Sequence, residues 1–217
     1  MSWLMAAVYD GMMRGSEEAC LAAWRKALLA ELSGAVLEIG AGTGSTLGLY
    51  PKSVTRLVMS EPDPHMRRKL QAKGAAVSPF AIEDLPFQGE FDAVVCSLVL
   101  CSVKDQKAAL AQIRKVLKPG GRLVFLEHVA ADGRPNRLKW QRTIEPVWKH
   151  LMGNCHLTRR TEAEIQAAGF RIEKIQRESM RKALPESRSS SLNDASTRTS
   201  SCRVASLAAA AWSSASW

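Results

Sequence analysis

Apolar residues along the chain follow two periods that alternate. Short apolar runs typical of buried strands occupy residues 35–40, 56–61, 75–81, 91–97, 121–129 and 170–178. Helical spacing is found at 16–32, 43–49, 63–73, 105–117, 137–152 and 161–168. Ser16 is the expected N-cap of the first helix, and the segment 118–121, KPGG, is an expected break. Strands that alternate with helices predict an α/β fold, a doubly wound parallel sheet with helices on both faces.

The end of the chain follows neither period. Eleven of the last 31 residues are serine, and the final segment, SLAAAAWSSASW, has no strand or helix pattern. This composition predicts disorder or weak helix rather than a packed strand, and a shifted reading frame would also explain it. We therefore expect one domain over 1–185, with a helical cap at 1–33 and a helical insert at 134–160. The Ser/Ala-rich tail at 186–217 is expected to be disordered or aberrant.

Charge and cysteine usage narrow the function classes. The net charge is +9, and residues 134–182 carry 12 basic and 5 acidic side chains. Such a segment suits either an anionic surface or simply solvent, and it lacks the signature of a nucleic-acid-binding motif. Five cysteines without a CxxC pair indicate neither a disulfide framework nor a metal site, so we expect a reducing cytosol. No apolar run reaches the ~20 residues of a membrane span, and the N-terminal segment does not have the pattern of a signal peptide.

The strongest local signal is a glycine loop after the first predicted strand. Gly40, Gly42 and Gly44 form a GxGxG pattern that lets the backbone approach a ligand closely. No lysine follows Gly44, so the loop is not a phosphate-binding P-loop, and Ser45 replaces the last glycine of the dinucleotide GxGxxG pattern. Glu38 just before the loop favours a cationic ligand over a phosphate. An NAD(P)-binding oxidoreductase remains the alternative.

Four blocks in order then carry a family resemblance. They are VLEIGAGTG (36–44), SEPD (60–63), FDAVVCSLVLCSV (91–103) and VLKPGGRLVFLEHV (116–129). Over roughly residues 5–178 the chain resembles the class I S-adenosylmethionine-dependent methyltransferases. It is most similar to the ubiquinone/menaquinone group and to the methyltransferase-like thiol S-methyltransferases, whose LVLCSV and CHLTR segments it shares. The resemblance implies an enzyme with a Rossmann-like sheet and S-adenosyl-L-methionine as its cofactor.

The resemblance also implies roles for individual residues. Glu61 would accept both ribose hydroxyls, and Glu38 would reach the ammonium group directly or through water. Met66 and Ile82 would wall the adenine or serve only as core. Ala81 replaces the residue that usually meets the adenine amino group, which leaves Glu83 or Asp84 for that contact. The expected cofactor residues are Glu38, Gly40, Ala41, Gly42, Thr43, Gly44, Glu61, Pro62, Met66, Ile82, Glu83, Cys96 and Ser97.

The acceptor side is less defined. His128 is the expected general base, with His156 second, although either histidine could be structural. Tyr9 and Trp140 complete the expected substrate residues, Trp140 on an amphipathic helix that either packs on the sheet, binds an apolar acceptor or touches a membrane surface. The expected acceptor is a small, largely apolar thiol or quinol-like phenol, with a phospholipid amine next. A cofactor-binding protein without turnover is the other alternative, and the pattern does not define an oligomeric state.

Overall fold

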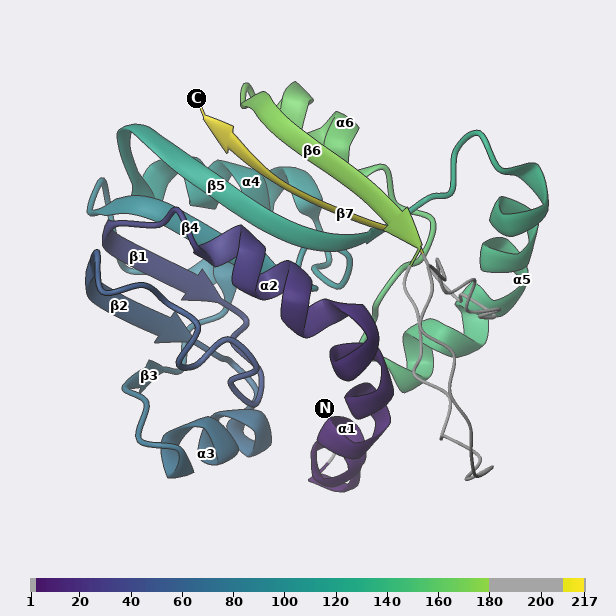
Figure 1. Ribbon diagram of the computed structural model, residues 1–217, viewed down its shortest axis with the longest axis horizontal. Coiled ribbons are helices and arrows are strands. Elements are labelled where there is room, and N and C mark those ends of the chain that lie inside the picture. Colours follow the sequence, from purple (N-terminus) through teal and green to yellow (C-terminus); the bar gives the residue numbers. More distant parts are fainter. Residues whose placement is uncertain (1–2, 180–208, 217) are drawn as a thin grey trace, which may run out of the picture.

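One mixed sheet organises the molecule (Figure 1). The computed structural model describes residues 3–179 and 209–216, and within them seven strands run in the order β3-β2-β1-β4-β5-β7-β6. The strands are β1 Gly34–Ile39, β2 Val54–Ser60, β3 Val77–Ser78, β4 Phe91–Ser97, β5 Leu117–Val129, β6 Arg171–Ser179 and β7 Ala209–Ser216. The first five pair in parallel, and β7 is antiparallel to both β5 and β6. The predicted α/β class with a central parallel sheet is confirmed.

Helices cover both faces of this sheet. They are α1 Trp3–Ser16, the π-helical turn η1 Glu17–Leu21, α2 Ala22–Leu29, α3 Pro64–Ala72, the 3-10 turn η2 Ile82–Asp84, α4 Gln106–Val116, α5 Pro135–Leu151 and α6 Thr161–Ala167. Figure 1 shows α2 crossing one face of the central strands, with α4 and α6 on the opposite face. Alternate residues of the same strands serve the two layers because successive side chains point to opposite faces.

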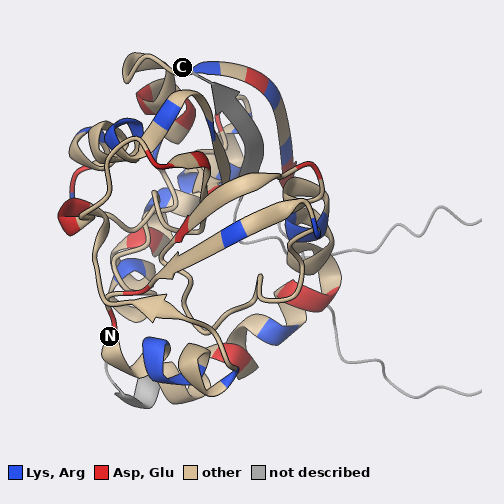
Figure 2. Ribbon diagram, turned by 90° about the vertical axis from the view of Figure 1, so that its left-hand side faces the viewer, with Lys and Arg blue, Asp and Glu red and all other residues tan. Residues whose placement is uncertain are grey.

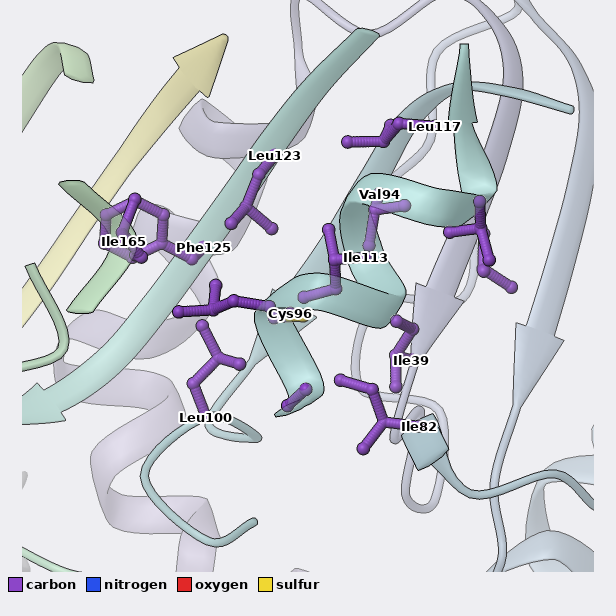
Figure 3. Close-up of a cluster of buried hydrophobic side chains, with 14 of the residues drawn as sticks. Ile39, Ile82, Val94, Cys96, Leu100, Ile113, Leu117, Leu123, Phe125 and Ile165 are labelled. Atoms are coloured by element: carbon purple, nitrogen blue, oxygen red, sulfur yellow. The ribbon is translucent and has the colours of Figure 1, made fainter. Parts of the chain in front are cut away.

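The two cores follow directly from that alternation. Val36, Val95 and Val124 pack with Leu29 of α2. Leu37, Val94 and Phe125 pack with α4 and α6, for example through Ile113 and Ile165. Figure 3 shows this second core, with Cys96 pointing into it among buried aliphatic side chains. Two apolar layers fix the sheet between them and leave the carboxyl ends of its strands to form a site.

Helix starts were predicted well where a side chain caps them. Asp63 accepts hydrogen bonds from the backbone N–H groups of His65 and Met66 and begins α3. Asp105 caps α4 in the same way through Lys107 and Ala108. The prediction for Ser16 was wrong, since it has helical backbone angles and no side-chain cap, and the helical stretch begins earlier, at Trp3. Apolar helix-forming residues upstream continue the helix through the would-be cap.

Two further predictions were wrong around glycines. Residues 43–49 form turns instead of a helix, because Gly44 and Gly48 have φ angles of +86° and +87° that a helix excludes. The segment 118–121 was expected to break the structure. Helix α4 does end just before it, at Val116, but the segment itself lies within β5. Phe91 pairs with Leu117 while Ala93 pairs with Arg122, so the glycine-rich segment bulges out of the ladder instead of ending the strand. The predicted strand at 75–81 is reduced to the two residues of β3.

The tail gives the largest correction. Residues Ala209–Ser216 form β7, which lies between β5 and β6, whereas the composition predicted no packed strand there. Strand β7 pairs with Arg122–Val129 of β5 along one edge and with Arg171–Ser179 of β6 along the other. The backbone of β7 therefore has hydrogen-bonding partners along both edges. Ladder pairing on two sides needs no apolar alternation, which is why the pattern did not reveal it. The rest of the predicted tail, residues 186–208, lies outside the described residues.

The distribution of charged residues along the fold does not indicate a particular partner. Figure 2 shows Lys and Arg positions mixed with Asp and Glu positions along the ribbon. Among the residues that the structure describes, no helix combines the length and the apolarity that crossing a bilayer requires.

Candidate active site

A cavity of about 680 Å³ opens at the carboxyl ends of β1, β2, β4 and β5. Most residues predicted from the sequence line it: Tyr9, Gly40, Gly42, Glu61, Pro62, Met66, Ile82, Glu83, Ser97 and His128. Others stay out of its wall: Glu38, Ala41, Thr43, Gly44, Cys96, Trp140 and His156. Asp84, the alternative to Glu83 for the adenine amino group, also lines it. Residues without a predicted contact complete it: Met13, Ile39, Asp63, Ala81, Leu98, Val99, Ser102, Val103, Lys104, Met152, Gly153 and Cys155. Most of the predicted lining residues therefore lie near the glycine loop, whereas Tyr9 and His128 lie at the opposite end of the cavity.

The glycine loop can approach a ligand because side chains are excluded from it. Gly40 and Gly44 have positive φ angles, and a Cβ atom at Gly40 would lie 2.7 Å from Val99 Cγ2. A Cβ atom at Gly44 would lie 2.5 Å from Leu70 Cδ1. Gly42, with φ +57°, has no atom within 4 Å of a Cβ position and lines the cavity, so its backbone is left open on that side. Three glycines are thus needed for conformation, for packing and for access.

Glu61 connects this loop to the end of β2. One carboxylate oxygen accepts a 2.8 Å hydrogen bond from the Gly42 backbone N–H, and the other accepts one of 2.8 Å from Asp63. Burial raises the pKa of Glu61. A carboxylate has about four acceptor positions, so two backbone donors leave capacity for the hydroxyl groups of a ligand in the cavity. Glu61 therefore supports the loop, and its contact with the ribose hydroxyls stays a prediction.

Glu38 has a different position from the one expected. Its carboxylate is completely buried and accepts hydrogen bonds of 2.7 Å from the hydroxyls of Thr46 and Tyr50. Burial raises the pKa of Glu38, and the side chain does not line the cavity. The structure thus shows Glu38 anchoring the far part of the glycine loop, and its contact with an ammonium group stays a prediction.

The N-terminal helix is fastened over the glycine loop. Thr43 donates a 2.6 Å hydrogen bond to Asp10 of α1, and Lys69 of α3 lies 3.2 Å from the other oxygen of Asp10. Lys73 donates to the Thr43 carbonyl at 2.7 Å. Thr43, which was expected to bind the cofactor, therefore holds α1 in place, and α1 in turn brings Tyr9 and Met13 to the cavity.

The opposite end of the cavity is apolar and contains sulfur. Tyr9, Met13, Leu98, Met152 and Cys155 line it, and burial raises the pKa of Tyr9 to about 12. Its phenol therefore stays protonated at neutral pH and can only donate or accept a hydrogen bond there. Small apolar molecules suit such a surface better than charged ones.

His128 lies among two thiols at this end. Its Nδ1 is 3.1 Å from Cys155 Sγ and 3.8 Å from Cys101 Sγ, and the two sulfur atoms are 3.5 Å apart. Hydrogen bonding with Cys101 lowers the pKa of Cys155, and the same contact together with burial raises the pKa of Cys101. The Trp148 ring meets the His128 ring edge-on with centroids 6.2 Å apart. The expected base is therefore present at the cavity but is engaged with sulfur.

Cys96, Trp140 and His156 lie outside the wall. The Cys96 side chain is in the core, so only its backbone could contact a ligand in the cavity. Trp140 on α5 is 48 % exposed. His156 Nδ1 lies 3.2 Å from Glu145 Oε1, which matches its structural alternative. The structure does not bring Trp140 or His156 to the cavity.

Comparison with known proteins decides the family. The model of a methyltransferase domain family matches residues 13–175, which is most of the chain. The chain belongs to this methyltransferase family. Its domain thus follows the resemblance seen in the sequence and not the oxidoreductase alternative.

Relatives and solved structures agree with that family. The thiol S-methyltransferase TMT1B of Homo sapiens is 38% identical over 146 residues, covering 63% of this chain and 59% of that protein. The demethylmenaquinone methyltransferase of Thermobifida fusca is 31% identical over 139 residues, covering 58% and 59%. The S-adenosylmethionine-dependent methyltransferase of Mesorhizobium loti has the same fold, with a TM-score of 0.62 at 18% identity over 93% of this chain and 98% of that chain. The match to these curated relatives spans about 59% of their length.

The residues of the methyltransferase cavity fit S-adenosylmethionine, the cofactor that the family implies. The wall carries four carboxylates, from Glu61, Asp63, Glu83 and Asp84, but only one lysine, Lys104, among its lining residues. This balance suits a cation and disfavours a phosphate. Met66 and Ile82 are buried apolar residues of the wall, which is compatible with their expected place beside the adenine. Ser97 accepts a 3.0 Å hydrogen bond from the buried Arg25 of α2, which fixes the end of β4 beside the loop.

One residue of the methyltransferase site was missed entirely. Glu127 is fully buried and accepts hydrogen bonds of 2.8–2.9 Å from the backbone N–H groups of Val99, Leu100 and Cys101. It thereby holds the turn after β4, in which Leu98 has a φ of +62° and lines the cavity. Such a conformation is costly for leucine and persists only where its surroundings fix it. A buried acid next to a histidine gives no pattern that would predict this role.

Replacing Glu127 with glutamine should lower the free energy of unfolding by about 1–3 kcal/mol, since the amide NH2 must face one of these buried N–H donors. Urea unfolding followed by circular dichroism measures the change. The matched control is Glu31→Gln, because Glu31 is exposed and should leave the midpoint unchanged. Equal midpoints for the two variants would contradict this role of Glu127.

Proposed function

We propose that this protein transfers a methyl group from S-adenosylmethionine to a small, largely apolar acceptor. The observation that carries the proposal is the cavity itself, which has Glu61 and the glycine loop at one end and apolar and sulfur-containing side chains at the other. A carboxylate suits the ribose hydroxyls through charge-assisted hydrogen bonds. The apolar end suits a small apolar acceptor that binds without its hydration shell.

The work of this chain is alignment and exclusion of water. When bound, S-adenosylmethionine supplies an already activated methyl group. Glu61 and the backbone of Gly42 fix the sugar end, and Tyr9, Leu98 and Met152 enclose the acceptor so that its nucleophile lies in line with the methyl group. Orientation of two reactants in a dry cavity accounts for much of what such a transfer needs.

A thiol leads among the acceptors, and a quinol-like phenol follows. The thiol S-methyltransferase of Homo sapiens supports the first and the demethylmenaquinone methyltransferase of Thermobifida fusca the second. Cys155 and Met152 give the acceptor end a soft, polarizable surface that suits sulfur. General base catalysis by His128 stays a prediction, since both thiols already contact its Nδ1.

The proposal also covers the compartment and the partners of the protein. The four cysteines in the described residues are free thiols, which supports a reducing compartment such as the cytosol. Helix α5 exposes Trp140, Val147 and Leu151 beside its basic residues, which supports shallow contact with a membrane surface. The proposal includes no nucleic-acid partner and makes no claim about oligomeric state.

Incubation of the purified protein with S-adenosylmethionine and a panel of thiols, quinols and lipid amines tests the function. We expect mass spectrometry to show adenosylhomocysteine together with a methylated thiol or, failing that, a methylated quinol. Calorimetry with adenosylhomocysteine, run on the same protein, reports binding separately from turnover. Binding without any methylated product would instead support the cofactor-binding alternative, and absence of binding would contradict both.

A further inference from the structure

The cluster of Cys101, His128 and Cys155 is built from three separate segments. Cys101 follows β4, His128 lies near the end of β5, and Cys155 follows α5. Their Sγ, Nδ1 and Sγ atoms lie within 4.8 Å of one another, and all three residues are buried. Two soft thiols and an imidazole form a donor set typical of zinc.

The distances are within about half an ångström of the edges of a metal tetrahedron. Zinc bonds of about 2.3 Å to sulfur and about 2.05 Å to nitrogen place tetrahedral ligand atoms about 3.6–3.8 Å apart. The atoms of the cluster are 3.1, 3.5 and 3.8 Å apart. Adjustments of a few tenths of an ångström in side-chain rotamers would bring all three edges to these values.

The backbone around the cluster is already fixed. Glu127 accepts from the Cys101 N–H, and the His156 N–H donates to the Cys101 carbonyl at 2.9 Å, which joins the two cysteine segments directly. Asn154 donates to the Ser102 carbonyl at 2.8 Å. Outer hydrogen bonds of this kind orient metal ligands and strengthen binding.

The cluster borders the acceptor end of the cavity. His128 and Cys155 line the cavity, whereas Cys101 lies behind them and is fully buried. Three protein ligands with a fourth position left toward a cavity describe a catalytic zinc site, whereas structural sites use four protein ligands.

We propose that Cys101, His128 and Cys155 bind a zinc ion whose fourth position faces the cavity and takes the acceptor as a thiolate. Metal binding stands on the cluster alone, and the role of the fourth position rests on the proposed thiol methyl transfer. His128 is then a metal ligand and not the general base expected from the sequence. Two thiolates and a neutral imidazole balance the charge of Zn²⁺, so an added thiolate leaves a negative site that suits the sulfonium beside it.

The transfer step balances without a further reactant. The acceptor thiol releases its proton to the buffer when its sulfur coordinates zinc, because a coordinated thiol is deprotonated. A lone pair of that sulfur forms the new S–CH3 bond as the bond between the methyl group and the sulfonium sulfur breaks. The electron pair of the broken bond stays on the sulfonium sulfur, which gives adenosylhomocysteine and a neutral methyl thioether.

Metal content and cobalt spectra test the site without using activity. Protein purified under reducing conditions without chelator should carry about one zinc ion per chain, as a three-ligand site predicts. After chelation, Co²⁺ should give the visible bands of a tetrahedral ion and a thiolate charge-transfer band in the near ultraviolet. Absence of both zinc and the cobalt bands in the reduced protein would overturn the proposal, whether or not Cys101 and Cys155 form a disulfide in air.

Matched variants separate the site from general damage. Cys101→Ser and Cys155→Ser should each lower zinc affinity by more than about 100-fold, beyond the usual effect of losing an outer-shell contact. Cys20→Ser is the control, because Cys20 is also buried but lies in a different core cluster with its Sγ against the Ser16 carbonyl. Adenosylhomocysteine binding should persist in all three variants, which shows that each is folded. Equal zinc affinity in the three variants would contradict the assignment of Cys101 and Cys155 as ligands.

Activity then distinguishes the two proposals. Chelated protein should keep adenosylhomocysteine binding while its rate of thiol methylation falls by at least about 10-fold, the lower end for lost metal-ligand support, and added Zn²⁺ should restore it. Thiol methylation that survives complete removal of zinc would contradict the role of the fourth position and leave the methyltransferase function standing, whereas zinc binding itself is decided by metal content and the cobalt spectra. Zinc binding in a protein that methylates no thiol would contradict the role of the fourth position alone.

Discussion

Replacing Glu61 with glutamine should weaken adenosylhomocysteine binding by roughly 30- to 1000-fold, or about 2–4 kcal/mol. The variant loses the negative charge that strengthens hydrogen bonds from the ribose hydroxyls. Its amide NH2 must also face a backbone N–H of either Gly42 or Asp63, since the two carboxylate oxygens accept one bond from each. Loss of either bond loosens the glycine loop, so the ligand contact and its support fail together. Calorimetric titration measures the affinity.

Glu90→Gln provides the matched control for that titration. Glu90 pairs with Arg56 at the surface, with both side chains well exposed, so the same chemical change there should leave affinity unaltered. Thermal melting of both variants shows whether Glu61→Gln remains folded at the temperature of the titration. A folded Glu61→Gln protein that binds adenosylhomocysteine as tightly as the parent would refute the assignment of Glu61 to the sugar.

Local pattern placed the glycine loop and Glu61 at the cavity because each directly follows a strand that apolar residues mark. The loop follows β1 directly, and Glu61 follows β2, the neighbouring parallel strand, so both arrive at the same edge of the sheet. The surroundings of Glu38 could not be predicted in this way, although its hydrogen-bond partners are close in the sequence. Its position before the loop pointed to a ligand, but only the folded turn shows Thr46 and Tyr50 closing over its carboxylate.

Apart from Tyr9 and His128, the residues at the far end of the cavity were not predicted from local pattern. Met13 reaches it because α1 continues through Ser16, and Met152 reaches it because the segment after α5 folds back on the turn after β4. The zinc cluster shows the same limit, since its ligands come from three segments and form no CxxC pair. The expectation of no metal site came from the lack of such a pair, and distances between segments now argue against it.

The strand at the end of the chain shows a different limit. Sequence pattern reports burial of side chains, whereas β7 is specified by backbone pairing with β5 and β6 on both sides. The strand starts of β1, β4 and β6 were predicted within a residue because apolar runs mark them. A segment that is rich in serine and alanine has no apolar run. Only the unpaired edges that β5 and β6 would otherwise have could have indicated a strand there.

Removing β7 should therefore damage the fold more than any single substitution. A chain that ends at residue 208 loses eight paired positions along one edge of β5, which keeps β4 on its other edge, and eight along β6. At a net of about 0.5–1.5 kcal/mol per hydrogen bond, the loss is comparable with the whole stability of a domain, about 5–15 kcal/mol. We expect the melting transition to fall sharply or vanish, with aggregation through the opened strand edges. Circular dichroism and light scattering during heating measure both effects.

The matched control keeps β7 and removes the segment before it. Ser179 pairs with Ala209, so the ends of β6 and β7 lie side by side and a short Gly/Ser loop can replace residues 182–206. A shorter loop costs less entropy to close, so this variant should melt at or slightly above the temperature of the parent. If the chain ending at residue 208 instead melts like the parent, the stability of the sheet does not depend on β7. The comparison thus assigns any loss to the strand and not to the length of the deleted segment.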